Sequence, residues 1–153
     1  MADTIVAQIT SEIKTTLDGM TSYGGTVTSS LERYYNHIND RYPYLEILGP
    51  YAIVETETDD VMDTVIQYAF KYYIKYNDEE FADVEVAKVV ENVVRDITKQ
   101  IMADQQRSGL AENTEITESG ISFEEIDGEV DFCVYVICEV QTIIDGSDPY
   151  LLG

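Results

Sequence analysis

Basic side chains are scarce in this chain. Nine Lys and Arg stand against 30 Asp and Glu, which gives a net charge of −21 at pH 7. Repulsion from that charge disfavours direct binding to a DNA or RNA backbone and to an anionic membrane surface. The same charge is also expected of a protein that only needs solubility or inhabits a salty environment. The charge therefore disfavours nucleic acids and anionic membranes as direct binding partners, but it does not identify a function.

The side chains that most enzymes use for catalysis are equally scarce. The single histidine, His37, has no Cys, Ser or second His with which to form a catalytic group. A glycine-rich phosphate loop, a metal quartet of Cys and His, and a G-x-S-x-G motif are all missing. The sequence thus predicts a protein that is not an enzyme, with no catalytic residues and no cofactor.

The chain also lacks a pattern for disulfides or for membrane insertion. Cys133 and Cys138 lie five residues apart in a predicted strand, so they point to opposite faces, out of disulfide reach. We expect both to be small buried apolar side chains. No run of 18 apolar residues occurs, and the first residues have no basic start, so we expect a soluble protein of a reducing compartment with no membrane partner.

Two acidic clusters are the remaining candidates for chemistry. They run from Asp59 to Asp63 and from Asp127 to Asp131, and their carboxylates could supply oxygen ligands to Ca²⁺ or Mg²⁺. Neither has the twelve-residue spacing of a calcium loop, and clustering is expected in a chain with 30 carboxylates. Solvated loops are the favoured interpretation, so no metal ligand is predicted.

The strongest positive feature is the segment from Thr64 to Tyr76, whose side chains alternate between two faces as in a β-strand. At about 3.3 Å per residue it would reach roughly 43 Å, whereas a domain of this length has a radius of gyration of about 15 Å. Long strands in small domains usually serve an assembly, because their ends and edges otherwise become pairing hazards. The pattern favours a structural subunit over an enzyme.

The remaining patterns predict a single domain of residues 1–153 in the α+β class. We expect a mainly antiparallel β-sheet with one long helix packed on a face, plus an N-terminal helix. In the last strand, the set Val130, Phe132, Val134, Val136, Cys138 and Val140 should face that long helix. The expected segments are a helix over 4–18, a short helix over 30–38, strands over 44–76, the long helix over 83–106, strands over 114–143 and a C-terminal arm over 145–153.

Within these segments the sequence predicts finer features. Tyr44–Leu48 and Tyr51–Glu57 are expected as two short strands around Gly49-Pro50, with an acidic loop over 58–63 leading into the long strand. Asp127-Gly128 is the predicted turn between the last two strands. The mixed face of the last strand, from Asp131 to Gln141, is expected to carry a subunit contact over part of its length.

Twelve tyrosines and no tryptophan also require an explanation. Tyrosine joins apolar area to a polar tip, so the rings either pack a sheet or build an interface. The candidate subunit interface is Tyr68, Tyr72, Tyr73, Tyr76, Tyr135, Tyr150, Leu151 and Leu152. The candidate loops facing a lumen or an axial neighbour are Asp59, Asp60, Asp63, Asp78, Glu79 and Glu80.

The order of helix, short strands, long strand, covering helix and terminal hairpin, with Tyr42-Pro43 leading into the strand at Tyr44–Leu48, resembles the tail-terminator proteins of long-tailed bacteriophages. These are also called tail-completion or minor tail proteins. The parts that match the layout of this family are Leu31–Pro43 with the following strand, Thr64–Tyr76, Val84–Met102 and Val130–Ile143.

This resemblance implies a structural virion protein, assembled in the host cytoplasm and located in the tail or neck. It implies a ring of six subunits that caps the tail tube and joins it to the head-closure or connector protein. DNA would pass through the lumen without specific binding. The acidic excess is compatible with that role, because lumen carboxylates repel phosphates even where salt limits the field to a Debye length of about 8 Å.

Three alternatives remain open at this point. Another phage neck or tail-tube ring protein would share most of these features. An acidic DNA-mimic inhibitor would present carboxylates along a continuous surface, and a metal-dependent hydrolase would need carboxylates that converge in a pocket.

Overall fold

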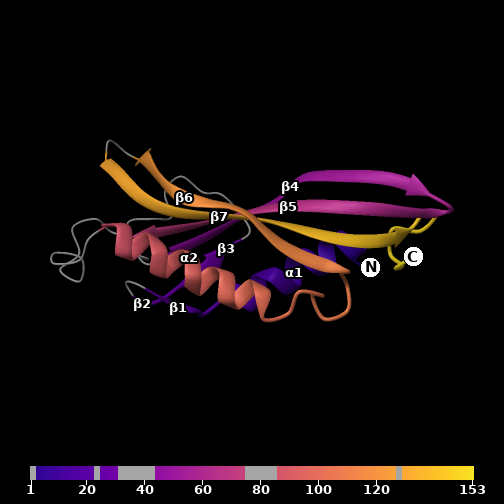
Figure 1. The fold of residues 1–153 in the computed structure, drawn as a ribbon, viewed down its shortest axis with the longest axis horizontal. Helices are drawn as coiled ribbons and strands as arrows, with labels where there is room; N and C mark the ends of the chain where they lie inside the picture. Colours follow the sequence, from indigo (N-terminus) through magenta and orange to yellow (C-terminus); the bar gives the residue numbers. More distant parts are fainter. Residues whose placement is uncertain (1–2, 23–24, 31–43, 75–85, 127–128) are drawn as a thin grey trace.

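The computed structural model describes residues 3–22, 25–30, 44–74, 86–126 and 129–153. Its fold is α+β, as predicted, with two helices on a largely antiparallel sheet (Figure 1). The elements are α1 (Ile5–Leu17), β1 (Thr21–Ser22), β2 (Gly25–Thr26), β3 (Thr28–Ser30), β4 (Tyr44–Thr58), β5 (Val61–Ile74), α2 (Val86–Met102), β6 (Asn113–Ile126) and β7 (Glu129–Asp145).

Two long hairpins make up the main sheet. Its strand order is β3-β4-β5-β7-β6, and every pair is antiparallel except β3 with β4. β4 and β5 form one hairpin, β6 and β7 form the other, and β5 and β7 join them from Val61↔Asp145 to Ile74↔Phe132. A separate two-stranded sheet holds β1 and β2. The sheet is therefore long and narrow (Figure 1).

Both helices pack on the same face of the sheet. α1 contributes buried Ile5, Ile9, Ile13 and Leu17, and α2 contributes buried Val89, Val93, Ile97 and Ile101. The predicted alternation of β5 and β7 is confirmed, because one face of each strand is buried under these helices. On β5 the covered set is Thr64, Ile66, Tyr68, Phe70, Tyr72 and Ile74, and on β7 it includes Val134, Val136, Cys138 and Val140.

Three predicted boundaries were wrong. Residues 44–58 form one strand, not two, because β4 passes Gly49-Pro50 with only a register shift between Leu48 and Ala52. The acidic loop over 58–63 shrinks to a two-residue turn, since β5 begins at Val61 and Asp59 and Asp60 both have positive φ, at 45° and 68°. Left-handed φ at both positions is what a tight β-hairpin turn requires.

The third wrong boundary is the end of the long helix, which stops at Met102 rather than at residue 106. The chain then turns, and Arg107 and Ser108 take positive φ of 48° and 57°. The Asp104 carboxylate accepts hydrogen bonds from the backbone N–H groups of Gln106 and Ser108. Such local side-chain bonds compete with helix formation and here replace the expected last turn.

Gly49 marks the register shift in β4. Its φ is +149°, and a Cβ at this position would lie 2.6 Å from Cδ1 of the Tyr68 ring. Only glycine combines that backbone conformation with so close an approach. Its position allows β4 to continue past the irregularity as one strand.

Several predictions fall on residues outside the described ranges. The short helix over 30–38 lies there except for Ser30, which belongs to β3 and not to a helix. The turn residues Asp127 and Gly128 also lie there, although the flanking pair Ile126↔Glu129 is in register. Tyr76, Asp78, Glu79 and Glu80 lie outside the described ranges as well.

Candidate assembly surfaces

The described ranges do not bring a set of metal-ligating side chains together. Among these residues, no three His, Cys, Asp or Glu side chains gather in a way that could hold a metal ion. Asp59, Asp60 and Asp63 are all exposed at the tip of the β4–β5 hairpin. Cys133 and Cys138 form no disulfide with each other and are buried, as predicted, and they lie in separate clusters on opposite faces of the sheet. Burial raises the pKa of the Cys138 thiol to about 12.

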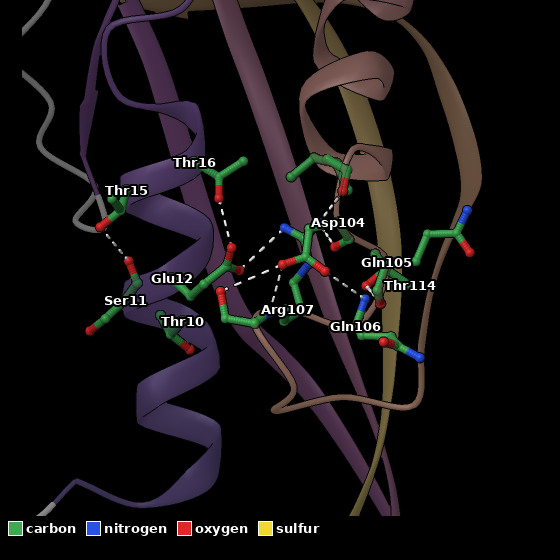
Figure 2. Close-up of polar contacts among 12 residues, drawn as sticks. Thr10, Ser11, Glu12, Thr15, Thr16, Asp104, Gln105, Gln106, Arg107 and Thr114 are labelled. Carbon is green, nitrogen blue, oxygen red and sulfur yellow. Dashed lines mark hydrogen bonds and ion pairs between the residues drawn. The ribbon is translucent and has the colours of Figure 1, made fainter.

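A buried arginine joins the two helices. Arg107 is fully buried, and its guanidinium donates to the Ile101 and Asp104 carbonyls and, at 3.2 Å, to Oε2 of Glu12 on α1 (Figure 2). Thr114 donates to the Gln105 carbonyl in the same loop. Because both terminal nitrogens of the guanidinium donate to chain carbonyls or to a carboxylate, this cluster is a structural clamp between α1 and the segment after α2.

Three of the tyrosines predicted to form a subunit interface are inside the molecule. Tyr68 and Tyr72 are fully buried beneath the helices, and the Tyr68 hydroxyl lies 2.8 Å from that of Thr10. That burial raises the pKa of Tyr68 to about 12. Tyr73 is buried on the opposite face with Tyr44 and Cys133. The interface prediction is wrong for these three, because alternation identifies a strand but does not show which faces are covered.

The other predicted contact residues remain on the surface. Tyr135 is half-buried on the face of the sheet away from the helices, which we call the outer face, and its hydroxyl donates to Glu118 at 3.2 Å. This hydrogen bond raises the pKa of Tyr135. Tyr150, Leu151 and Leu152 are between 43% and 55% exposed.

The C-terminal arm folds back on its own chain. Leu152 bridges Ile144 of β7, and the backbone N–H of Gly153 donates to the Ile143 carbonyl at 2.9 Å. The N–H of Asp145 donates to the Leu151 carbonyl, and the N–H of Ile5 donates to that of Pro149. The arm therefore extends the sheet beside β7 and also holds the start of α1.

The most exposed apolar segment was missed by the sequence reasoning. Past its register shift, β4 leaves Tyr51, Ile53 and Val54 exposed by 52%, 44% and 59%. β3 pairs only with residues 44–46 of β4, so among the described residues the other side of the strand from Tyr51 to Thr58 is an open edge. In the sequence, the run Tyr51-Ala52-Ile53-Val54 has the apolarity of a core strand and carries no sign of its exposure.

The outer face of the sheet is mixed. Register places Val54 and Ala52 of β4 on this face together with Val65 and Ala69 of β5. Ile137 of β7 pairs with Ala69 and continues this apolar strip, and it is only half-buried. Polar residues interrupt the strip, since Gln67 lies between Val65 and Ala69 and donates to Glu139 of β7.

A groove runs between α2 and β6. Its volume is about 770 Å³. α2 contributes Val90, Val94 and Arg95 to its lining, and β6 contributes Ser119 and Ile121. β6 is the last strand of the main sheet among the described residues, so the groove lies beside a second open edge.

The exposed basic residues of the described ranges lie on α2, and one of them, Arg95, lines this groove together with Glu91. The basic residues of the described ranges are Lys14, Lys71, Lys88, Arg95, Lys99 and Arg107. Only Lys88, Arg95 and Lys99 are exposed, and all three lie on α2. Spacings of seven and four residues place them on one side of a helix. We call these three side chains the basic stripe.

A scan against models of known protein families found no match, and a search of curated proteins found none either. Neither α1 nor α2, the helices of the described part of the chain, is long and apolar enough to cross a membrane.

Proposed function

We propose that this protein is a structural subunit that assembles into a ring at the neck of a long-tailed bacteriophage, as a tail terminator. The ring would cap the tail tube and meet the head-closure or connector protein. The observation that carries the proposal is the open-edged, apolar strand from Tyr51 to Thr58, a type of edge that a free monomer normally blocks. The layout resemblance supplies the viral assignment.

Two further observations support an assembly role. The outer face includes exposed or half-buried apolar side chains at Val54, Val65 and Ile137. The basic stripe contrasts with a net charge of −21, which gives one surface of the molecule an affinity for acidic surfaces.

Native mass tests the assembly directly. Light scattering over a range of protein concentrations, with negative-stain imaging of the largest species, is expected to show rings with a central hole. Raising the salt from about 50 mM to about 500 mM should strengthen association, because it screens repulsion between strongly acidic subunits. A strict monomer under all of these conditions would contradict the proposal.

The acidic hairpin turn is proposed to face the lumen or an axial neighbour. Asp59, Asp60 and Asp63 are exposed together at the tip of a projecting hairpin. Replacing all three with lysine should leave ring formation intact but reduce DNA delivery, because lumen lysines would bind phosphates. Unchanged delivery by virions that carry the triple variant would remove this loop from the lumen.

An acidic inhibitor of a nucleic-acid-binding enzyme is the second candidate. The exposed carboxylates of Glu55, Glu57, Asp59 and Asp60 follow one another along the same hairpin, as a phosphate-mimicking surface would require. Capture of a basic nucleic-acid enzyme by the native chain, lost in Glu55→Lys/Glu57→Lys, would favour this function over the ring.

A further inference from the structure

Among the residues that the structure describes, two open edges lie at opposite sides of the same sheet. β6 ends the sheet order on one side, and the strand from Tyr51 to Thr58 is open on the other. An edge strand can accept a strand of another molecule through main-chain hydrogen bonds. When two different edges of one chain pair, the contact is heterologous and repeats from copy to copy, as a ring requires.

The side chains of the β4 edge match the surface beside β6. Opposite residues in antiparallel strands share a face, so the pairs Ile53↔Ile66 and Glu55↔Thr64 place Ile53 and Glu55 on the helix side. Glu57 pairs with Met62 and lies on the same side. Ile53 and Glu55 also line a groove of about 430 Å³ under the hairpin, so no element of the described chain covers them fully.

The receiving side offers the complementary features. Laid along β6, this strand would direct Ile53 towards the apolar lining formed by Val90, Val94 and Ile121. Glu55 and Glu57 would face the basic stripe on α2. Arg95 is available for such a contact, since its ion pair with Glu91, at 2.5 Å, is about two-thirds exposed and therefore weak.

Glu115 and Glu118 of β6 do not oppose this arrangement. Of the four β6 carboxylates, Glu115 pairs with Glu139 and Glu118 with Ile137, so these two lie on the outer face. The β4 residues that would share that face are uncharged, namely Ala52, Val54, Thr56 and Thr58. On the helix side the neighbouring β6 residues Ser119 and Ile121 are uncharged too.

We propose that residues Tyr51–Thr58 of one copy pair with the β6 edge of the next copy, over its α2 helix. Ile53 enters the groove, and Glu55 and Glu57 face the basic stripe. The occupant is a second copy of this chain, because the helix side of its open edge carries one apolar residue and two carboxylates, which complement the apolar groove lining and the basic stripe. This inference rests on the proposed ring function and specifies its subunit contact.

Charge exchange between the two surfaces tests the contact. Glu55→Lys/Glu57→Lys alters the hairpin, and Lys88→Glu/Arg95→Glu/Lys99→Glu alters the stripe; all five side chains are exposed, so folding should be preserved. Each variant alone should raise the dissociation constant for self-association by about tenfold or more. The two variants mixed, or all five changes in one chain, should restore assembly. Association that is unchanged in either variant, or a mixture that fails to assemble, would overturn the contact.

A matched control separates the local contact from the change in net charge. Asp18→Lys/Glu112→Lys changes the net charge by the same amount as the hairpin variant, and both residues are exposed and neither lines the groove. This variant should associate at least as well as the native chain. A loss equal to that of the hairpin variant would assign the effect to net charge and overturn the contact.

Disulfide trapping gives a second measurement. Both native cysteines are fully buried, so an engineered surface thiol reacts selectively. Ile53→Cys and Val94→Cys, made in separate chains and mixed under mild oxidation, should form a dimer between the two variants, whereas Ile53→Cys mixed with Glu112→Cys should not. Native rings without this cross-link would overturn the contact and leave the ring function standing. A native chain that never associates would contradict both.

Discussion

Strands β4 and β5 are paired along nearly their whole length, yet their surroundings differ. From Thr64 to Ile74, every second side chain of β5 is buried under the helices. From Tyr51 to Thr58, β4 contains no buried side chain although it begins with an equally apolar run. Figure 1 shows the β4–β5 hairpin running past the end of α2. Apolar strand residues thus have two surroundings here: beneath the helices they form the core, and beyond them they are exposed, where we propose that they meet a second copy.

The two regions should differ most in the free energy of unfolding that is lost when an apolar side chain is replaced by alanine. Phe70→Ala, in the covered region, should lower the free energy of unfolding by about 3–5 kcal/mol through the cavity it leaves. Val54→Ala, on the projecting part of β4, should change it by less than about 0.5 kcal/mol. Urea denaturation at concentrations where scattering reports single chains measures both. Equal losses would mean that the hairpin is part of the core.

Ion pairs should show the same contrast. Arg107→Ala should cost about 3–4 kcal/mol, because it leaves carbonyls and Glu12 without their donor in a buried site. Arg95→Ala should cost at most about 0.5 kcal/mol, since that pair is exposed. A double-mutant cycle with Glu12→Gln isolates the pair itself. A small loss for Arg107→Ala would show that α1 does not depend on the clamp.

Glycine substitutions extend the comparison to the backbone. Gly49→Ala should cost about 3 kcal/mol, because Gly49 combines a φ of +149° with a contact against the Tyr68 ring. Gly109→Ala should cost only about 1 kcal/mol, since it has a positive φ but open space around it. Thermal unfolding of the two variants, measured side by side, checks the order. The reverse order would place the strain in the loop after α2.

The smallest expected effect is a dependence of stability on pH that comes from Tyr68 and appears only in alkaline solution. Its pKa is raised from 10.0 in the unfolded chain to about 12 in the folded chain, so its contribution is complete below pH 10 and is lost as the pH rises towards 12. The free energy of unfolding should therefore fall between pH 9 and pH 11, and this fall should be smaller in Tyr68→Phe than in the native chain. The pKa of Cys138 is also raised, so its contribution to stability is lost over an overlapping pH range. The variant Cys138→Ala separates its effect from that of Tyr68. A loss of equal size in Tyr68→Phe would assign the alkaline sensitivity to other groups.

Much of the fold could be predicted from side-chain periodicity. The N-terminal helix, the long strand, the covering helix and the buried set on β7 all follow from apolar residues at regular spacing, because burial of one face requires that spacing. The boundaries at Met102 and Val61 could not, since they depend on local hydrogen bonds of Asp104 and on the left-handed turn at Asp59 and Asp60.

The candidate surfaces were less predictable than the fold. Tyr68 and Tyr72 look like interface residues in a sequence, and the helices that bury them are encoded elsewhere in the chain. The groove exists because α2 lies next to β6 in the fold, and no local sequence pattern reveals that these two elements are neighbours. The run at Tyr51 to Val54 gave no sign that it would project beyond the helices.

The sequence by itself determined the α+β class, the alternation that defines the strands, the acidic character and the opposite orientation of the two cysteines. These properties depend on residue type and spacing along the chain. Only the tertiary structure decided which apolar faces are covered, where the edges are open and which charges stand next to a groove. Those properties depend on how far each helix extends over the sheet, which is set by contacts between residues distant in the sequence.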